Sequence, residues 1–160
     1  MSKVQLATLC YVRSPEKGTL LVHRNKNKGD LHLGKWNGLG GKIAPGESPE
    51  QCVIREVCEE SGLNIFNPVL AGILTFPCFS TDTDWYVFVF TANQFDGSLH
   101  ECDEGSLEWV TDELLFSLPM WEGDRIFLPL VMSGKLFSGR FCYREGILVE
   151  HEINIYKANT

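Results

Sequence analysis

The chain has 160 residues, of which 44% are hydrophobic, and its formal net charge is −7. This length supports one hydrophobic core and hardly two, so we expect one domain over residues 1–160. The negative charge argues against a broad surface for a nucleic-acid polymer or an anionic membrane. No apolar run approaches the length of a membrane span, and residues 1–10 lack the pattern of a secretory leader, so we expect no membrane partner.

The cysteines show no CxxC pair and no regular disulfide framework. They are Cys10, Cys52, Cys58, Cys78, Cys102 and Cys142. Their neighbours are apolar or belong to a predicted helix, which predicts buried or semi-buried free thiols in a reducing, cytoplasmic environment. The four histidines are not paired with cysteines at zinc-ligand spacing, so a zinc site is not expected.

The first predicted elements form a β-hairpin. Residues 4–12 alternate and are rich in β-branched side chains, residues 13–18 carry turn residues, and residues 19–24 read as the returning strand. Residues 25–35 are polar and glycine-punctuated, and we expect most of their charges to be solvated. Arg24, at the end of the second strand, is the better candidate for a phosphate contact.

Residues 41–63, GKIAPGESPEQCVIREVCEESGL, predict a loop, a helix and a second loop. Ser48 is a good N-cap, Pro49 suits the first helical position, and Gln51 completes a capping box. Gly62 predicts a left-handed end to the helix. The predicted buried stripe consists of Val53, Ile54 and Val57.

Three carboxylates stand on one face of this helix, because Glu56, Glu59 and Glu60 are spaced i, i+3 and i+4. Neighbouring carboxylates repel one another and stay ionised only beside a cation. One interpretation is an exposed acidic helix face. The other is a site for Mg²⁺ or Mn²⁺, whose hard-cation chemistry suits carboxylate oxygens.

Strands dominate the rest of the chain. We predict strands at 69–79, 85–93, 107–110, 136–143 and 147–155, a turn at 96–98, loops at 100–104 and 119–124, a capped helical turn from Thr111, and a helix at 125–133. Pro129 makes that last helix imperfect. The fold class that follows is α/β, with a mixed sheet between helices.

The spacing of Gly41, Glu47, Arg55-Glu56, Glu59-Glu60 and Gly62 resembles the signature box of the Nudix hydrolases. The resemblance implies an α/β/α sandwich with the box at 41–63, and hydrolysis of a diphosphate linkage with Mg²⁺, or Mn²⁺, held by glutamates. Carried onto matching positions, Glu56 and Glu60 are the metal ligands and Glu59 is a third ligand or the water-activating base. The Gly40 carbonyl is a further ligand.

The resemblance also suggests roles for residues beside the metal ligands. Arg55 orients a box carboxylate through bidentate hydrogen bonds, whereas Glu47 braces the loop. A glutamate from outside the box joins the site in such enzymes, and Glu104, just before the strand at 107–110, matches that location. Glu104 is therefore a candidate metal ligand or base, with a solvated loop acid as the alternative.

Residues 36–38 and 119–124 resemble a narrower, MutT-type branch whose members hydrolyse oxidised purine nucleoside triphosphates. By that resemblance Trp121 stacks on the purine, Asn37 binds the base edge, and Asp124 matches the second of two adjacent acids. Gly123 stands in place of the first acid, which weakens the case for selectivity toward 8-oxoguanine. The alternative for Trp121 is a core position; the other tryptophans are read as structural.

These observations favour an Mg²⁺-dependent pyrophosphohydrolase that converts a purine nucleoside triphosphate, such as 8-oxo-dGTP, into the monophosphate and pyrophosphate. Alternatives are a broader Nudix hydrolase of dNTPs, nucleoside diphosphate derivatives or RNA 5′ ends, and a non-catalytic nucleotide sensor. The expected partner is a small nucleotide. Monomer and homodimer both remain open.

Overall fold

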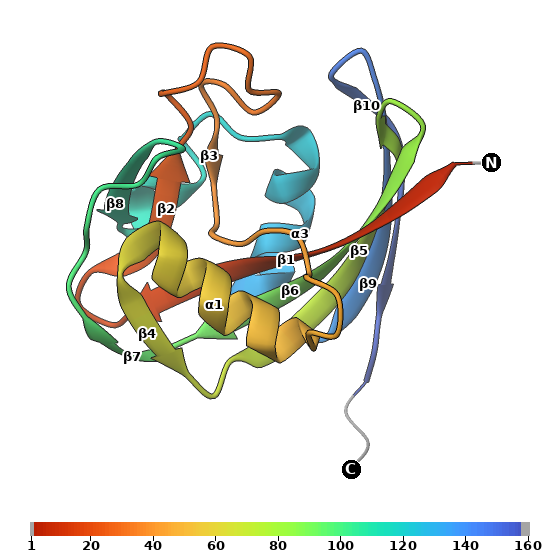
Figure 1. The fold of residues 1–160 in the computed structure, drawn as a ribbon. Coiled ribbons are helices and arrows are strands. Elements are labelled where there is room, and N and C mark those ends of the chain that lie inside the picture. Colours follow the sequence, from red (N-terminus) through yellow and green to blue (C-terminus); the bar gives the residue numbers. More distant parts are fainter. Residues whose placement is uncertain (1, 158–160) are drawn as a thin grey trace.

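In the computed structural model, which describes residues 2–157, strands β1 (Lys3–Ser14) and β2 (Gly18–His23) form the predicted antiparallel hairpin. From Lys3 to Val12, β1 also pairs in parallel with β6 (Thr83–Ala92). This double pairing places β1 inside the main sheet, next to a strand that lies far along the chain (Figure 1).

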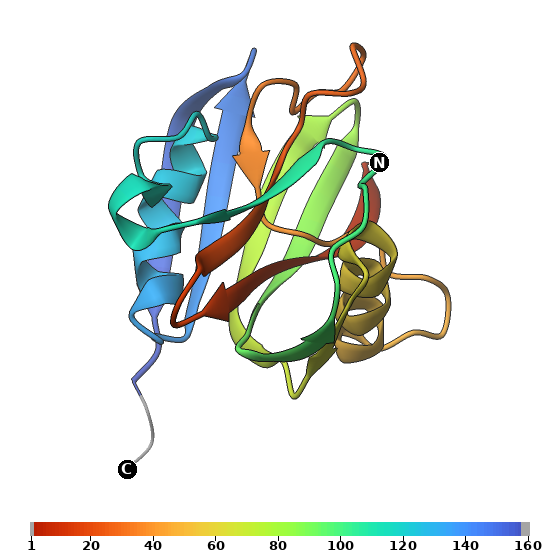
Figure 2. The same ribbon diagram turned by 90° about the vertical axis from the view of Figure 1, so that its left-hand side faces the viewer.

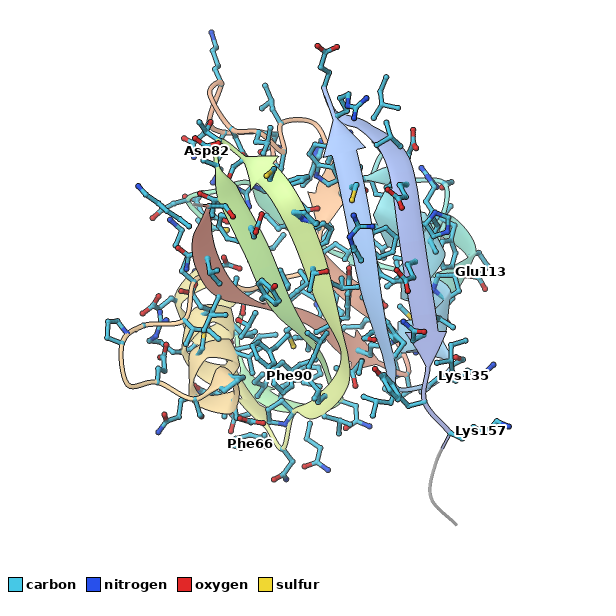
Figure 3. All side chains as sticks on the ribbon, turned by 90° about the vertical axis from the view of Figure 1, so that its right-hand side faces the viewer. Phe66, Asp82, Phe90, Glu113, Lys135 and Lys157 are labelled. Atoms are coloured by element: carbon cyan, nitrogen blue, oxygen red, sulfur yellow. The ribbon has the colours of Figure 1, made fainter. Side chains whose placement is uncertain are left out.

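The main sheet is mixed, with the strand order β10-β9-β5-β6-β1-β2-β3 and β8 paired to β2. Its other members are β3 (Trp36–Asn37), β5 (Val69–Ser80), β8 (Ser106–Val110), β9 (Phe137–Arg144) and β10 (Ile147–Ile155). The β5–β9 pair is parallel, whereas β5–β6 and β9–β10 are antiparallel. Figure 3 shows these four strands side by side, with Asp82 at the β5–β6 turn. The strands predicted at 69–79, 85–93, 107–110, 136–143 and 147–155 are confirmed to within a few residues.

Helix α1 (Pro49–Ser61) confirms the predicted helix and its capping signals. The Ser48 side chain accepts a hydrogen bond from the Gln51 amide, the Gln51 side chain returns one to Ser48, and Gly62 ends the helix at φ 84°. Val53 and Val57 are fully buried. Ile54 is 39% exposed, so its predicted place in the buried stripe is wrong; at i+1 from Val53 it points around the helix toward solvent.

Two hydrophobic clusters lie on opposite faces of the main sheet, since successive β1 side chains alternate. Cys10 and Val12 pack with Val57 of α1, whereas Tyr11 packs with Phe127 of helix α3 (Glu122–Met132). Figure 2 shows the sheet lying between α1 and α3. The structure therefore has the expected α/β/α sandwich, with the short α2 (Asp112–Leu115) as a further turn of helix.

Three local predictions are wrong. The predicted turn at 96–98 overlaps β7 (Gln94–Gly97), which pairs with β4 (Leu63–Phe66) in a separate two-stranded sheet. The predicted loop at 119–124 ends early because α3 begins at Glu122, where acidic side chains suit the positive end of the helix dipole. Cys78 is exposed, whereas the other five cysteines are buried or half-buried; all six are free.

Candidate functional site

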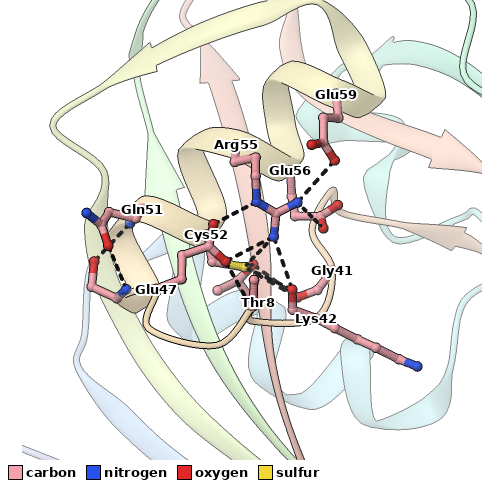
Figure 4. A network of polar contacts seen from close by, with 11 residues as sticks. Thr8, Gly41, Lys42, Glu47, Gln51, Cys52, Arg55, Glu56 and Glu59 are labelled. Atoms are coloured by element: carbon pink, nitrogen blue, oxygen red, sulfur yellow. Dashed lines mark hydrogen bonds and ion pairs between the residues drawn. The ribbon is translucent and has the colours of Figure 1, made fainter.

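Arg55 is the centre of a polar network on α1 (Figure 4). Its Nε and Nη2 donate to the two carboxylate oxygens of Glu47 at 2.6 and 3.0 Å, and its Nη1 donates to Glu56 at 2.8 Å and Glu59 at 3.1 Å. The hydrogen bonds from Arg55 lower the pKa of Glu47 to about 2. Glu47 also accepts from the Ala44 amide at 2.8 Å, so the loop before the helix is tied to Arg55.

The Glu56 carboxylate lies directly against the loop backbone at Gly41. A Cβ atom added to Gly41 would lie 2.4 Å from Cδ of Glu56, which is closer than any real contact. A glycine at this position therefore lets the loop approach the carboxylate. Together with the Arg55 bond, this contact limits where the Glu56 oxygens can lie.

Glu60 is enclosed beside the same loop, and its Oε2 accepts a hydrogen bond from the Gly40 amide at 3.2 Å. Burial raises the pKa of Glu60, and the nearby carboxylates of Glu104 and Glu56 raise it further. Glu104 comes from the loop before β8 and pairs with Arg24 at 3.0 Å. Acids from two distant segments therefore crowd together here, as the sequence predicted for Glu104.

The donor set of Glu56, Glu60 and Glu104 fits Mg²⁺ or Mn²⁺, because all its ligands are hard oxygens whose mutual repulsion a cation would relieve. Within residues 2–157, however, no group of three or more acidic, histidine or cysteine side chains is arranged so that it could hold a metal ion. Arg24 and Arg55 hold two of these carboxylates, so a bound ion would replace those ion pairs in part. Glu59, whose side chain is 60% exposed, faces Arg55 instead.

A cleft of about 530 Å³ lies next to these acids. Its lining includes most of the predicted site residues: Arg24, Asn37, Gly40, Glu56, Glu104, Trp121 and Asp124. The cleft therefore joins acidic groups of the Nudix-like box to the residues expected to bind a base. Arg55, Glu59 and Glu60 do not line it, and Arg24 reaches it with its guanidinium already paired to Asp30 and Glu104.

Trp121 lies in an aromatic cluster rather than on an open loop. It is the N-cap residue of α3 and only 7% exposed. Its ring centroid is 5.2 Å from those of both Phe79 and Tyr143, in edge-on geometry, and the Lys35 ammonium lies 4.6 Å from the ring centroid. Trp121 thus combines the two alternatives, because it is packed as a core residue and also lines the cleft.

Asp124 lies in the first turn of α3 and Asn37 in β3, and both line the cleft. Burial raises the pKa of Asp124 to about 7, against the opposing effect of Lys35 and Arg125. Near neutral pH this carboxyl can therefore accept or donate a hydrogen bond. An amide and such a carboxyl are suited to the polar edge of a base.

Gly123 is the predicted departure from the two-acid pattern, and the structure shows what occupies the space. The Gly123 amide donates to the Tyr143 hydroxyl at 2.7 Å. A Cβ at Gly123 would lie 2.7 Å from that hydroxyl and 2.9 Å from a ring carbon of Phe141. Position 123 therefore has no room for an acidic side chain while Tyr143 is in place.

No local pattern in the sequence indicates several of the residues that build this cleft, and two of them correct its expectations. Most charges of residues 25–35 are expected to be solvated, yet His32 is half-buried and accepts the Trp121 indole N–H at 2.8 Å. The sequence predicts a structural role for Trp85, yet this residue lines the cleft. Tyr143 and Phe79 lie in or beside predicted strands, and only the tertiary fold brings them to Trp121.

Comparison with known proteins identifies the family. Residues 3–131 match the NUDIX domain model. An uncharacterised Nudix hydrolase of Bacillus subtilis is 35% identical over 148 residues, covering 89% of each chain. An oxidized purine nucleoside triphosphate hydrolase of Danio rerio is 34% identical over 152 residues, covering 94% of each chain.

A solved structure agrees with these relatives. The crystal structure of a MutT protein from Bacillus halodurans superposes with a TM-score of 0.82 at 31% identity, covering 94% of this chain and 97% of that one. The chain therefore belongs to the Nudix family. Within that family it is a MutT-like hydrolase. In the described residues, no helix has both the length and the apolar character to cross a membrane.

Proposed function

We propose that this protein is an Mg²⁺-dependent pyrophosphohydrolase that converts a purine nucleoside triphosphate, with 8-oxo-dGTP the leading candidate, into the monophosphate and pyrophosphate. The observation that carries the proposal is that the same cleft is lined by the acids Glu56 and Glu104 and by the candidate base-binding residues Trp121 and Asp124. The name of the Danio rerio relative supports the substrate class. We place the reaction in a reducing cytoplasm, where the free cysteines are stable.

Glu56, Glu60 and Glu104 are the residues that would hold the metal, with the Gly40 carbonyl as a further ligand. A bound divalent ion supplies charge neutralisation for the phosphate chain and a more acidic water. Arg55 positions Glu56, and Arg24 positions Glu104. Either Glu59 or Glu104 takes the proton from the attacking water, as the sequence left open.

The base lies against Trp121, where stacking contributes about 1–3 kcal/mol per base. Asn37 and Asp124 bind its edge. Because residue 123 is a glycine, packed against Tyr143, Asp124 is the one carboxyl of the residue 123–124 pair available to the base. This favours, as a second candidate, a hydrolase that tolerates several nucleotides, since a site with fewer paired groups rejects fewer analogues.

A pyrophosphate-release assay with Mg²⁺ tests the proposal against both the broader hydrolase and the non-catalytic sensor. The panel contains 8-oxo-dGTP, dGTP, dATP and dCTP. ADP-ribose is added with release of AMP as the readout, because its cleavage gives AMP and ribose 5-phosphate and no pyrophosphate. We expect the highest kcat/KM for an oxidised or unmodified purine triphosphate. Equal kcat/KM across the panel supports the broader enzyme, and absence of turnover with nucleotide binding retained supports the sensor.

A further inference from the structure

The loop between β2 and β3 contacts both the acidic part of the cleft, at Glu104, and its aromatic part, at Trp121. At one contact, the Trp121 Nε1–H donates to His32 Nδ1 at 2.8 Å, and the two rings are 5.7 Å apart at 83°. An imidazole nitrogen accepts only through its lone pair, so this bond assigns the tautomer protonated at Nε2. Burial of His32, together with nearby Arg24, lowers its pKa and so favours this neutral form.

Asp30 holds the same loop in shape through both of its carboxylate oxygens. Oδ1 accepts from the His32 backbone amide at 3.0 Å, and Oδ2 accepts from Arg24 Nε at 2.7 Å. The Asp30 side chain is only 8% exposed, and its hydrogen bonds with Arg24 and His32 lower its pKa despite burial. A half-buried ion pair with two defined bonds is a rigid connection compared with an exposed one.

The connection continues from Arg24 to the acids. Arg24 Nη1 lies 3.0 Å from Glu104, so one guanidinium bridges Asp30 and Glu104 through different nitrogens. Glu104 is close enough to Glu60 to raise that group's pKa. Polar contacts therefore run without interruption from the Trp121 indole, through His32, Asp30 and Arg24, to Glu104.

We propose that His32 and Asp30 are positioning residues that connect the base-binding Trp121 to the carboxylate of Glu104. The inference rests on the proposed function and adds residues to it. Through this connection, a base seated against Trp121 fixes the loop in the arrangement in which Arg24 places Glu104. Base binding and the geometry of the acids then depend on the same few hydrogen bonds, because the members of one polar network act together.

Paired variants of His32 test the first bond. His32→Leu removes the acceptor at similar volume, whereas His32→Asn places an amide oxygen near the position of Nδ1. The exposed Lys28, on the same loop, supplies the control Lys28→Ala. The probe is the Trp121 indole N–H in NMR spectra, assigned with Trp121→Phe. We expect His32→Leu to shift this signal and speed its exchange with water, and His32→Asn to restore both.

The same variants are then assayed for turnover of 8-oxo-dGTP and dGTP with Mg²⁺. We expect His32→Leu to raise KM roughly three- to tenfold, the size of one lost hydrogen bond. It should lower kcat by a smaller factor, because the loop that carries Asp30 and Arg24 is then no longer held to Trp121. His32→Asn should recover at least half of the change in log KM and at least half of the change in log kcat. Lys28→Ala should stay within about twofold of wild type.

A double-mutant cycle tests the connection itself. In the described residues Trp121 and Asp30 each bond to His32 and not to each other. If the contacts act as one unit, the effects of Trp121→Phe and Asp30→Asn on kcat/KM are not independent. The loss in the double variant should then be smaller, by at least about threefold, than the product of the two single losses. Trp121→Phe combined with Lys28→Ala should equal the product.

Two results would overturn the inference: equal losses in His32→Leu and His32→Asn, or independent effects in the Trp121–Asp30 cycle. Failure of the proposed function looks different, because wild type would then hydrolyse none of the nucleotides. In that case the NMR signal of the Trp121 indole N–H still tests the connection between Trp121 and Asp30. Asp30→Asn must shift the Trp121 signal as His32→Leu does, and an unchanged signal contradicts the connection.

Discussion

The two parts of the cleft are built in opposite ways. The acidic part is mostly local and charged, with Glu104 its one distant member. Glu47, Arg55 and Glu56 lie within ten residues of one another and are held by ion pairs between α1 and the loop before it. The base-binding part is aromatic and assembled from distant segments. It includes His32, Phe79, Trp121 and Tyr143, from four separate places in the chain.

This difference means that the two parts respond to different perturbations. Charge changes on α1 alter the chemistry and need not disturb packing, because most of its carboxylates face the cleft or solvent. Changes in the aromatic cluster alter packing and substrate choice together, since Trp121 is 7% exposed. Variants that separate turnover, selectivity and stability therefore test the comparison directly.

The largest effect is expected for Glu56→Gln and Glu60→Gln. Loss of a charged group that serves only the reacting centre costs on the order of a hundred- to a thousandfold in kcat. Stability should not fall, and Glu60→Gln should raise it slightly, because burial and nearby Glu104 and Glu56 disfavour the ionised Glu60. Pyrophosphate release and thermal unfolding measure both quantities.

The matched control for these variants is Glu50→Gln, an exposed carboxyl in the first turn of the same helix. It should retain the activity of wild type within about twofold. Full activity in Glu56→Gln and Glu60→Gln would contradict the assignment of both residues as metal ligands.

The next effect concerns Trp121. Trp121→Ala should lower kcat/KM for purine triphosphates by roughly 10- to 100-fold, because stacking contributes about 1–3 kcal/mol, and should flatten the preference among bases. It should also destabilise the fold by about 3–5 kcal/mol, since it empties a buried aromatic site. Trp121→Phe keeps a ring and should recover most of the stability. Unchanged base preference in Trp121→Ala contradicts the stacking role.

We expect Asp124 to make the stability of the fold depend on pH, with an effect of intermediate size. Burial raises its pKa from 3.8 to about 7, so the folded protein holds this proton more tightly than the unfolded chain. The resulting stabilisation is complete below about pH 3.8, the unfolded value, and is lost as pH rises toward 7, by at most about 1.4 kcal/mol per pH unit.

Asp124→Asn should remove this contribution, so its unfolding free energy should depend less on pH between about 4 and 7 than that of wild type. Urea unfolding across that range measures the slope. The exposed Glu113→Gln is the control and should follow wild type. Identical slopes in Asp124→Asn and wild type would show that Asp124 is not held in a buried, protonated form.

The predictability of the two parts follows from their construction. Residues 41–63 carry their own caps, glycines and acids, so α1 and its acidic face could be predicted from the local pattern. The partners of Trp121 could not, because His32 lies in a polar loop and Tyr143 in a strand more than twenty residues beyond the tryptophan. Nothing in the local spacing indicates that sheet pairing brings them together.

Gly123 is a second position at which the local sequence could not predict the surrounding structure. The sequence indicated a missing acid there, but only the fold shows that Tyr143 and Phe141 fill the space where a side chain would lie. The start of α3 was likewise misplaced, because the dipole-compatible acids at its first turn also resemble a loop. Long-range contacts determine what surrounds Gly123, whereas the start of α3 depends on a local pattern that helices and loops share.

The smallest effects should come from a cycle between positions 123 and 143. Tyr143→Phe removes the acceptor of the buried Gly123 amide and should cost about 1 kcal/mol. Gly123→Ala should cost about 1–3 kcal/mol, because its new Cβ would lie 2.7 Å from the Tyr143 hydroxyl.

The double variant should be more stable than the sum of these costs predicts, since removal of the hydroxyl gives the Cβ part of the space it needs; Phe141 still limits the recovery. Urea unfolding gives all four free energies. The matched pair Gly123→Ala with Cys142→Ser, one residue from Tyr143, should be additive. Additivity in the Gly123–Tyr143 cycle would mean that the Tyr143 hydroxyl does not exclude a side chain at position 123, and Phe141 alone would then limit the space there.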